Sequence, residues 1–187
     1  MSKKRDLLLS TALELFYQHG IHSIGVNEVI KVSGVAKKTL YSHFSSKEEL
    51  ILKALEKRHR TFMQWLESKL ENTANNRELI DTLFASLESW FNSAEPELSK
   101  FNGCFFINTS AEFHDANSEI SRYCRFHKAE VRWLIQSKLS EGSEALLNAI
   151  CLLKEGAITT TYMTGESAET IKNSVKILHQ LECQTPR

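Results

Sequence analysis

The chain has 187 residues, and its 23 lysines and arginines balance 23 aspartates and glutamates, so its formal net charge at pH 7 is zero. The charges are unevenly spread, because residues 1–60 carry 11 basic and 6 acidic side chains whereas residues 61–187 carry 12 basic and 17 acidic ones. A basic end attached to an acidic remainder predicts that the first third faces a nucleic acid or a membrane surface.

Composition also excludes several classes of protein. No apolar stretch approaches the roughly 18 to 20 residues of a membrane-spanning helix, and the N-terminus leads into an amphipathic repeat instead of a signal segment. We therefore expect a cytoplasmic protein without a membrane partner. The four cysteines are widely spaced, with no CxxC pair, and are expected to be free thiols there. With only 2 prolines and 7 glycines, the chain is expected to be all-α.

The first 44 residues have the pattern of three short helices. Apolar residues recur at helical spacing over residues 5–19, and Gly20 follows where a helix C-cap belongs. Residues 26–33 and 36–44 predict two further helices joined at Gly34, an arrangement typical of the helix-turn-helix unit, whose second helix enters the DNA major groove. The polar and basic side chains of that second helix suit DNA contact: Lys37, Lys38, Thr39, Tyr41, Ser42 and His43.

A fourth helix is predicted to begin at Lys47, because Ser46 and Glu49 match the N-terminal capping box. A lysine in the first turn is disfavoured by the positive end of the helix dipole, unless a phosphate lies beside both. We therefore interpret Lys47 as a contact to the DNA backbone. The alternative is an ordinary solvated lysine.

This ordered set of residues resembles the DNA-binding domain of the TetR family of bacterial transcriptional repressors. The resemblance rests on the run GVAKKTLYSHFSSKEEL at residues 34–50, preceded by ALELF at residues 12–16 and by Gly20. Gly25 and Ala36 depart from the family pattern, which usually places a hydroxyl-bearing helix cap at these positions, and a lost side-chain cap costs about 1 kcal/mol. The resemblance implies that these side chains face DNA: Asn27, Lys37, Lys38, Thr39, Tyr41, His43 and Lys47.

Beyond residue 52 the prediction depends on the periodicity of apolar residues. The fourth helix is expected to continue to residue 70, and later helices are expected over residues 77–94, up to about 113, over 118–139, from Ser143 to about residue 163, and over 168–181. The resemblance implies nine helices in all. Three would form a helix-turn-helix DNA-binding domain of residues 1–46, and six an effector-binding and dimerisation domain of residues 47–187.

The last two long helices are the predicted site of self-association. The first of them has apolar residues around more than half of its circumference, which favours a partner. The resemblance implies a homodimer held by a four-helix bundle. Two heads related by a two-fold axis would read a palindromic operator in double-stranded DNA.

The resemblance further implies a pocket for a small-molecule effector in the second domain. An apolar or aromatic effector is expected, because the candidate lining is mainly aromatic with a few polar groups that would orient a ligand. The alternative is that most of these aromatic residues belong to the core. The candidates are Phe62, Trp65, Trp90, Phe105, Phe106, Tyr123 and Trp133, with the polar Asn108, Glu112 and His127.

Two ideas about the cysteines remain open. Cys104 lies at the predicted start of a helix, where the dipole favours a thiolate, so it could sense oxidants or electrophiles; the alternative is a small buried hydrophobe. Cys124 and His127 are three residues apart on one predicted helix and could share a metal with Cys104 or His114. Nothing fixes further ligands at a diagnostic spacing, so no metal or cofactor is expected.

The predicted function is that of a TetR-type repressor that binds a palindromic operator as a dimer and is released by an effector. Release would follow when the effector favours a dimer with splayed heads, with the helix that starts at Lys47 as the lever. The alternatives are a redox or electrophile sensor that uses Cys104, and a helical interaction protein without an effector. An enzyme is not expected, because no phosphate-binding glycine loop, H-E-x-x-H or G-x-S-x-G motif is present.

Overall fold

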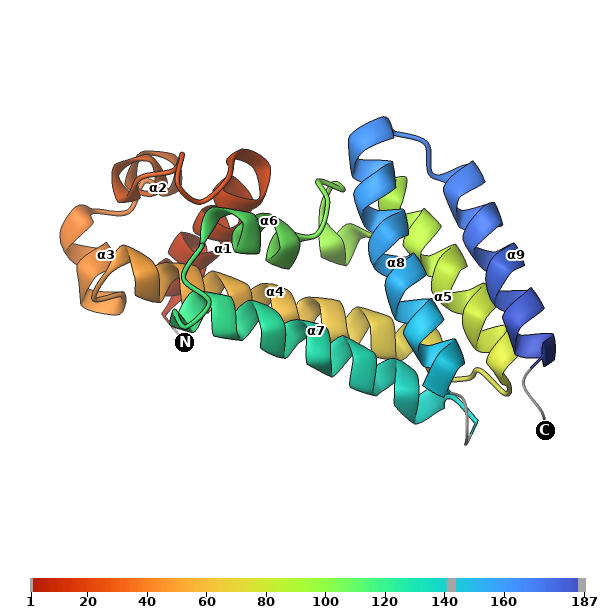
Figure 1. Cartoon of the computed structure of the whole chain (residues 1–187). Coiled ribbons are helices and arrows are strands. Elements are labelled where there is room, and N and C mark those ends of the chain that lie inside the picture. The colour runs from red at the N-terminus through yellow and green to blue at the C-terminus, as the bar shows by residue number, and fades with distance from the viewer. Residues whose placement is uncertain (1, 141–143, 185–187) are drawn as a thin grey trace. The chain divides into compact units, whose positions relative to one another are not determined.

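The computed structural model describes residues 2–140 and 144–184, which form nine α-helices and one short 3-10 helix (Figure 1). The all-α class is confirmed, and the helix bounds agree with the predicted ones to within about one turn. The predicted start at Ser143 lies outside the described residues. The helices are α1 (Lys3–His19), α2 (Val26–Ser33), α3 (Lys37–His43), α4 (Lys47–Leu70), α5 (Asn76–Phe91), the 3-10 helix η1 (Pro96–Leu98), α6 (Phe105–Glu112), α7 (Glu119–Lys138), α8 (Glu144–Thr164) and α9 (Ala168–Gln184).

The chain divides into two compact units. We call Met1–Arg60 together with Phe105–His127 the head unit, and Thr61–Cys104 together with Lys128–Arg187 the body unit. Helices α4 and α7 contribute residues to both. The head unit thus includes the first part of α4, all of α6 and the first part of α7 together with α1, α2 and α3. The predicted domain boundary between residues 46 and 47 stays a prediction.

Buried apolar residues hold the three N-terminal helices together. Leu8, Ala12 and Phe16 recur on one face of α1 and are almost fully buried, as the helical spacing predicts. Helix α2 ends at Gly34, whose φ of 66° lies in the left-handed region that glycine adopts without strain. The chain can therefore turn sharply there and begin α3.

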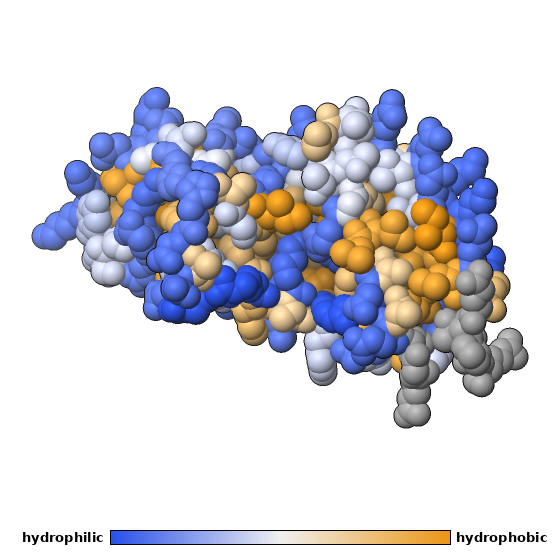
Figure 2. All heavy atoms as spheres, in the orientation of Figure 1, coloured by the Kyte–Doolittle hydropathy of each residue, from blue (hydrophilic) through white to orange (hydrophobic). Residues whose placement is uncertain are grey.

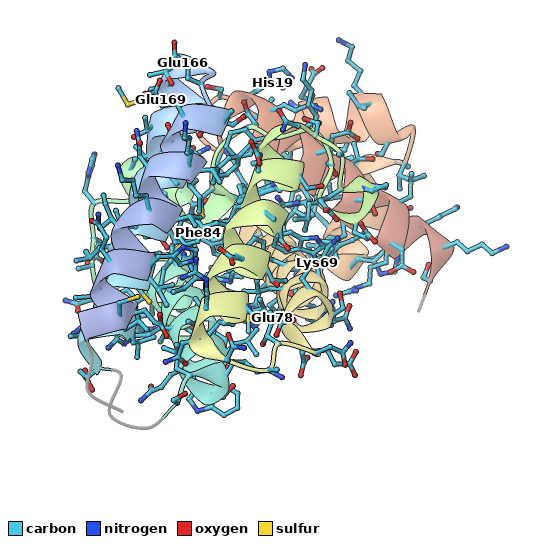
Figure 3. The ribbon with its side chains drawn as sticks, turned by 90° about the vertical axis from the view of Figure 1, so that its right-hand side faces the viewer. His19, Lys69, Glu78, Phe84, Glu166 and Glu169 are labelled. Carbon is cyan, nitrogen blue, oxygen red and sulfur yellow. The ribbon has the colours of Figure 1, made fainter. Side chains whose placement is uncertain are left out.

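Three helices of the body unit, α5, α8 and α9, pack side by side (Figures 1 and 3). Helix α5 has the broadest buried face, and Figure 3 labels Phe84 in the layer between α5 and α9. This residue is fully buried, as are Leu83 and Leu87 on the same helix. The side chain of Asn75 caps the helix by accepting a hydrogen bond from the backbone N–H of Glu78 at 2.9 Å. None of the helices within the described ranges is long and apolar enough to cross a membrane.

Candidate DNA-binding surface and effector region

The helix-turn-helix geometry is built by α2, the turn at Gly34 and α3. Leu40 and Phe44 are fully buried and fix the inner side of α3. The outer side carries the predicted DNA-contacting residues. Lys37, Lys38 and Tyr41 are exposed on α3, Asn27 is exposed on α2, and Thr39 and His43 are partly exposed. The structure therefore brings these six residues together on the α2 and α3 segments with accessible side chains.

Helix α4 begins where the sequence predicts, with a modified capping box. The Ser46 hydroxyl accepts a hydrogen bond from the Glu49 N–H at 3.1 Å, as expected. The Glu49 carboxylate reaches one residue further than in the standard box, because it accepts hydrogen bonds from both the hydroxyl and the N–H of Ser45 at 2.6 Å. These hydrogen bonds lower the pKa of Glu49. The start of α4 is thus tied to the end of α3.

Lys47 has a partner within the head unit. Its ammonium donates a hydrogen bond to the backbone carbonyl of Ile21 at 2.7 Å and lies 6.0 Å from the centre of the Phe16 ring. Burial lowers the pKa of Lys47, and the charges of Glu112 and Glu48 partly offset this effect. The phosphate contact predicted for this lysine stays a prediction.

Glu112, an expected pocket residue, contacts the connection between α1 and α2. Its carboxylate accepts hydrogen bonds from the backbone N–H of Ile21 at 2.8 Å and of His22 at 2.6 Å, and lies 3.5 Å from the His22 imidazole. Gly20 permits this approach, because its φ is 84° and a Cβ there would lie 3.3 Å from the carboxylate. No local pattern signals this contact, since about 90 residues separate the partners.

The expected pocket residues of the head unit form an aromatic and imidazole cluster. Phe106 stacks on His127 with ring centres 3.5 Å apart, and the Nδ1 atoms of His127 and His59 are 3.0 Å apart. Phe105 and Phe106 are buried, and Tyr123 packs edge-on against His59. Asn108, on α6, is partly buried.

A second aromatic cluster lies in the body unit. The Phe62 ring centre lies 5.2 Å from that of Trp65 and 5.6 Å from that of Trp90. The Trp65 indole N–H donates to Glu95 at 2.8 Å, and Glu95 also pairs with Lys69 at 3.0 Å. The expected lining therefore falls into two groups, three residues in the body unit and six in the head unit. Trp133 is 63% exposed and is not part of a buried group.

The body unit also contains a buried charged cluster that the sequence analysis missed. Lys154 is only 3% exposed and pairs with Glu155, which accepts from Lys128 at 2.7 Å. The Lys128 ammonium also lies 3.4 Å from the Cys104 sulfur. Burial lowers the pKa of Lys128, but the interactions with Cys104 and Glu155 raise it by a larger amount. The pKa of Lys128 therefore lies above its ordinary value. A lysine four residues after Ile150, inside the apolar stripe of α8, is the signal that could have revealed this cluster.

A surface hollow with a volume of about 840 Å³ lies along α9. None of the expected effector-pocket residues lines it. Its lining is Lys172, Val175, Lys176, His179, Gln180 and Cys183. All four cysteines are free thiols. Cys124 and His127 are both buried, but across the described ranges no three metal-ligating side chains come together.

An all-α chain with an N-terminal helix-turn-helix unit and an exposed basic α3 defines the class of helix-turn-helix DNA-binding proteins. Residues 8–54 match the family model described as "Bacterial regulatory proteins, tetR family". The chain is 36% identical over 93 residues to the transcriptional activator FasR of Mycolicibacterium smegmatis. The matched segment makes up 50% of this chain and 41% of FasR.

Two solved structures have the same fold over nearly the whole chain. SCO4454, a TetR-family transcriptional regulator from Streptomyces coelicolor, superposes with a TM-score of 0.84 at 22% identity, covering 98% of this chain and 96% of that one. The reduced form of NemR from E. coli gives a TM-score of 0.76 at 24% identity, covering 95% of each chain. Residues 8–54 thus match the TetR family of transcriptional regulators, and the chain has the fold of solved TetR-family structures.

Proposed function

We propose that this protein is a dimeric transcriptional repressor that binds a palindromic operator through α3 and is released by a small effector. The observation that carries the proposal is the exposed face of α3, where Lys37, Lys38 and Tyr41 project while Leu40 is fully buried. Lysines on a short helix of fixed orientation can reach guanine edges or phosphates, while Tyr41 and His43 suit phosphate contacts that set the register. Such a regulator acts in the cytoplasm, where the chromosome lies.

The outer faces of α8 and α9 support self-association. Leu152 and Met163 on α8 are 74% and 78% exposed, and Ile177 on α9 is 50% exposed. Figure 2 shows hydrophobic surface gathered over α8. Gly156 lies inside α8, where glycine costs about 1 kcal/mol relative to alanine. Apart from its two neighbours and the nearby backbone of α8, no atom of the described residues lies within 4 Å of its Cβ position. The close approach of a helix from a second copy accounts for both features.

Effector control is proposed to act on the spacing of the two heads of the dimer. An effector that binds one arrangement of the dimer more tightly shifts the population toward it. Helix α4 contributes to both units and is the proposed lever. The two aromatic clusters favour an apolar or aromatic effector, and the Thr161 hydroxyl is 5% exposed with no hydrogen-bond partner among the described residues, so it could orient a ligand.

The direct test is binding to DNA duplexes across a range of salt concentrations. Duplexes selected by the full chain from a random pool should bind with an affinity that falls steeply as salt rises. Lys37→Met and Tyr41→Phe should weaken this binding, whereas Lys172→Met on α9 should leave it unchanged. Binding that ignores both salt and the α3 substitutions would refute the proposal and favour an interaction protein with another acidic partner. A crosslink that fixes the separation of the two heads should abolish release by the effector.

A second candidate, thiol-based sensing at Cys104, is favoured by the position of Lys128. The Lys128 ammonium lies 3.4 Å from the Cys104 sulfur, and a neighbouring cation is a feature of the surroundings of reactive cysteines. The NemR structure is described as a reduced form, which adds support.

Alkylation distinguishes this candidate from control by a reversible effector. The Cys104 thiolate would add to the double bond of N-ethylmaleimide, and the bulky adduct would be forced into a buried site that is 7% exposed. Loss of DNA binding after treatment should therefore disappear in Cys104→Ser. It should persist in Cys183→Ser, which removes an exposed thiol. Equal sensitivity of both variants would exclude Cys104 as the sensor.

A further inference from the structure

The backbone of Ile21 is held from both sides by charged residues that are distant in sequence. Its N–H donates to the Glu112 carboxylate at 2.8 Å, and its carbonyl accepts from the Lys47 ammonium at 2.7 Å. Glu112 is the last residue of α6 and Lys47 the first of α4, so the backbone of one residue joins α6, the α1–α2 connection and α4. We refer to Lys47, Ile21 and Glu112 as the Ile21 clamp.

The Ile21 clamp controls the segment from which the helix-turn-helix unit departs. Only Ile21–Gly25 separate Gly20, which caps α1, from the first residue of α2. Neither α2 nor α3 has a side-chain N-cap, so their position depends on packing and on this connection. Hydrogen bonds to charged groups are the stronger ones in proteins. Two such bonds on the backbone of one residue restrict it strongly.

We infer that Lys47 and Glu112 are positioning residues that orient the helix-turn-helix unit for DNA through the Ile21 clamp. The inference rests on the proposed DNA-binding function. It also gives α6 a direct connection to the DNA-reading helices. The Lys47 ammonium is already partly removed from water, and one of its three N–H donors is used by the Ile21 carbonyl.

Two physical arguments separate this inference from a simple charge effect. A lysine that neutralises a phosphate releases a counterion, so its loss lowers the slope of log affinity against log salt by about 0.9. A positioning lysine changes the affinity but not this slope. For Glu112, simple electrostatics predicts that loss of a negative charge tightens DNA binding. The Ile21 clamp predicts instead that loss of the Glu112 charge weakens DNA binding.

The test measures affinity of the full chain for a selected duplex between 50 and 200 mM salt. Lys47→Met and Glu112→Gln remove the charges with little change of shape, and each should weaken binding about tenfold at an unchanged slope. Lys37→Met is the control for a lysine that contacts DNA directly, and it should reduce the slope by about 0.9. Lys53→Met removes another α4 lysine, which pairs with Glu56, and should have little effect.

The double variant Lys47→Met/Glu112→Gln adds a second criterion. Because both residues act on the backbone of Ile21, the double variant should lose less affinity than the product of the two single losses. Amide hydrogen exchange of the free protein is a third readout. In Glu112→Gln the amides of Ile21 and His22 should exchange faster, while those of α5 keep their protection. This measurement also applies if a variant binds DNA too weakly to titrate.

Several results would overturn the inference. A slope reduced by about 0.9 in Lys47→Met would identify a phosphate contact, and tighter binding by Glu112→Gln would identify a bare charge effect. Unchanged exchange at Ile21 and His22 would show that no clamp forms in solution. These outcomes leave the proposed function intact, whereas wild-type protein that shows no salt-dependent binding refutes the function itself.

Discussion

The head unit and the body unit differ in where their polar residues lie. In the head unit the candidate DNA-binding side chains are exposed on two consecutive short helices, so neighbouring residues in sequence are neighbours in the site. In the body unit the notable polar groups are buried and pair with residues that are distant in sequence. Lys128 binds Glu155 across 27 residues, and Trp65 binds Glu95 across 30. Local patterns can therefore reveal the first kind of site, whereas the second kind requires tertiary structure.

Core packing in the body unit should give the largest single effect. Phe84→Ala removes a fully buried ring from α5 and should lower the free energy of unfolding by about 3–5 kcal/mol, measured by urea denaturation. Trp133→Ala is the matched control, because this ring is 63% exposed and its loss should change stability by less than about 0.5 kcal/mol. Similar losses for both would mean that the outer face of α7 is buried in the dimer.

The head unit should show the reverse pattern, with a large effect on binding and almost none on stability. Lys37→Met/Lys38→Met should reduce affinity for a selected duplex about a hundredfold, if each contact contributes about 1.4 kcal/mol. The salt slope should fall by about 1.8, since two cations are lost. The midpoint of urea unfolding should stay unchanged because both side chains are exposed. A fall in stability would indicate that one lysine also supports the fold.

The fold was largely predictable from the sequence because helical periodicity and chain breakers are local. Gly20 and Gly34 end α1 and α2 where predicted, and Ser46 begins α4. The residues around α3 were predictable for the same reason. The partners of Lys47 and Glu112 were not predictable, because both side chains bind backbone groups of Ile21, and every residue type except proline offers the same N–H and C=O.

The expected pocket was harder to predict than the DNA-binding surface. Helical spacing identifies which aromatic residues are buried, and Phe62, Trp65 and Trp90 are indeed buried together. The same pattern does not distinguish a pocket wall from a packed core, because both require apolar faces. The charged cluster around Lys154 was overlooked for a related reason, since a lysine in an apolar stripe is easily taken for a surface residue whose stem is buried.

The buried carboxylate of Glu95 should give the body unit a pH dependence of moderate size. Burial raises the pKa of Glu95, but hydrogen bonds from Ser89, Lys69 and Trp65 lower it more, so its folded pKa lies below the ordinary 4.5. The associated stability is therefore present above pH 4.5 and is lost as pH falls through the folded pKa. Glu95→Gln should destabilise the protein by about 1–2 kcal/mol at pH 7.

The difference in the free energy of unfolding between Glu95→Gln and the wild type should become smaller as the pH falls below 4.5, as measured by urea unfolding at each pH. Glu97→Gln is the matched control, because Glu97 is an exposed neighbour on η1. If this difference in the free energy of unfolding stays constant from pH 7 to pH 3, the hydrogen bonds of Glu95 do not depend on its charge.

The smallest effect concerns the missing cap of α3. Ala36 occupies the N-cap position with extended backbone angles, φ −62° and ψ 144°, and offers no side-chain acceptor. Ala36→Ser places a hydroxyl where it can accept from an N–H of the first turn, and should raise the free energy of unfolding by about 0.5–1 kcal/mol. Ala36→Val, which adds bulk without an acceptor, should give no such gain. If valine stabilises as much as serine, the gain comes from apolar burial instead of capping. If neither substitution raises the free energy of unfolding, the first-turn N–H groups of α3 are already satisfied by water. The position of α3 would then depend on the packing of Leu40 and Phe44 and on the Ile21 clamp.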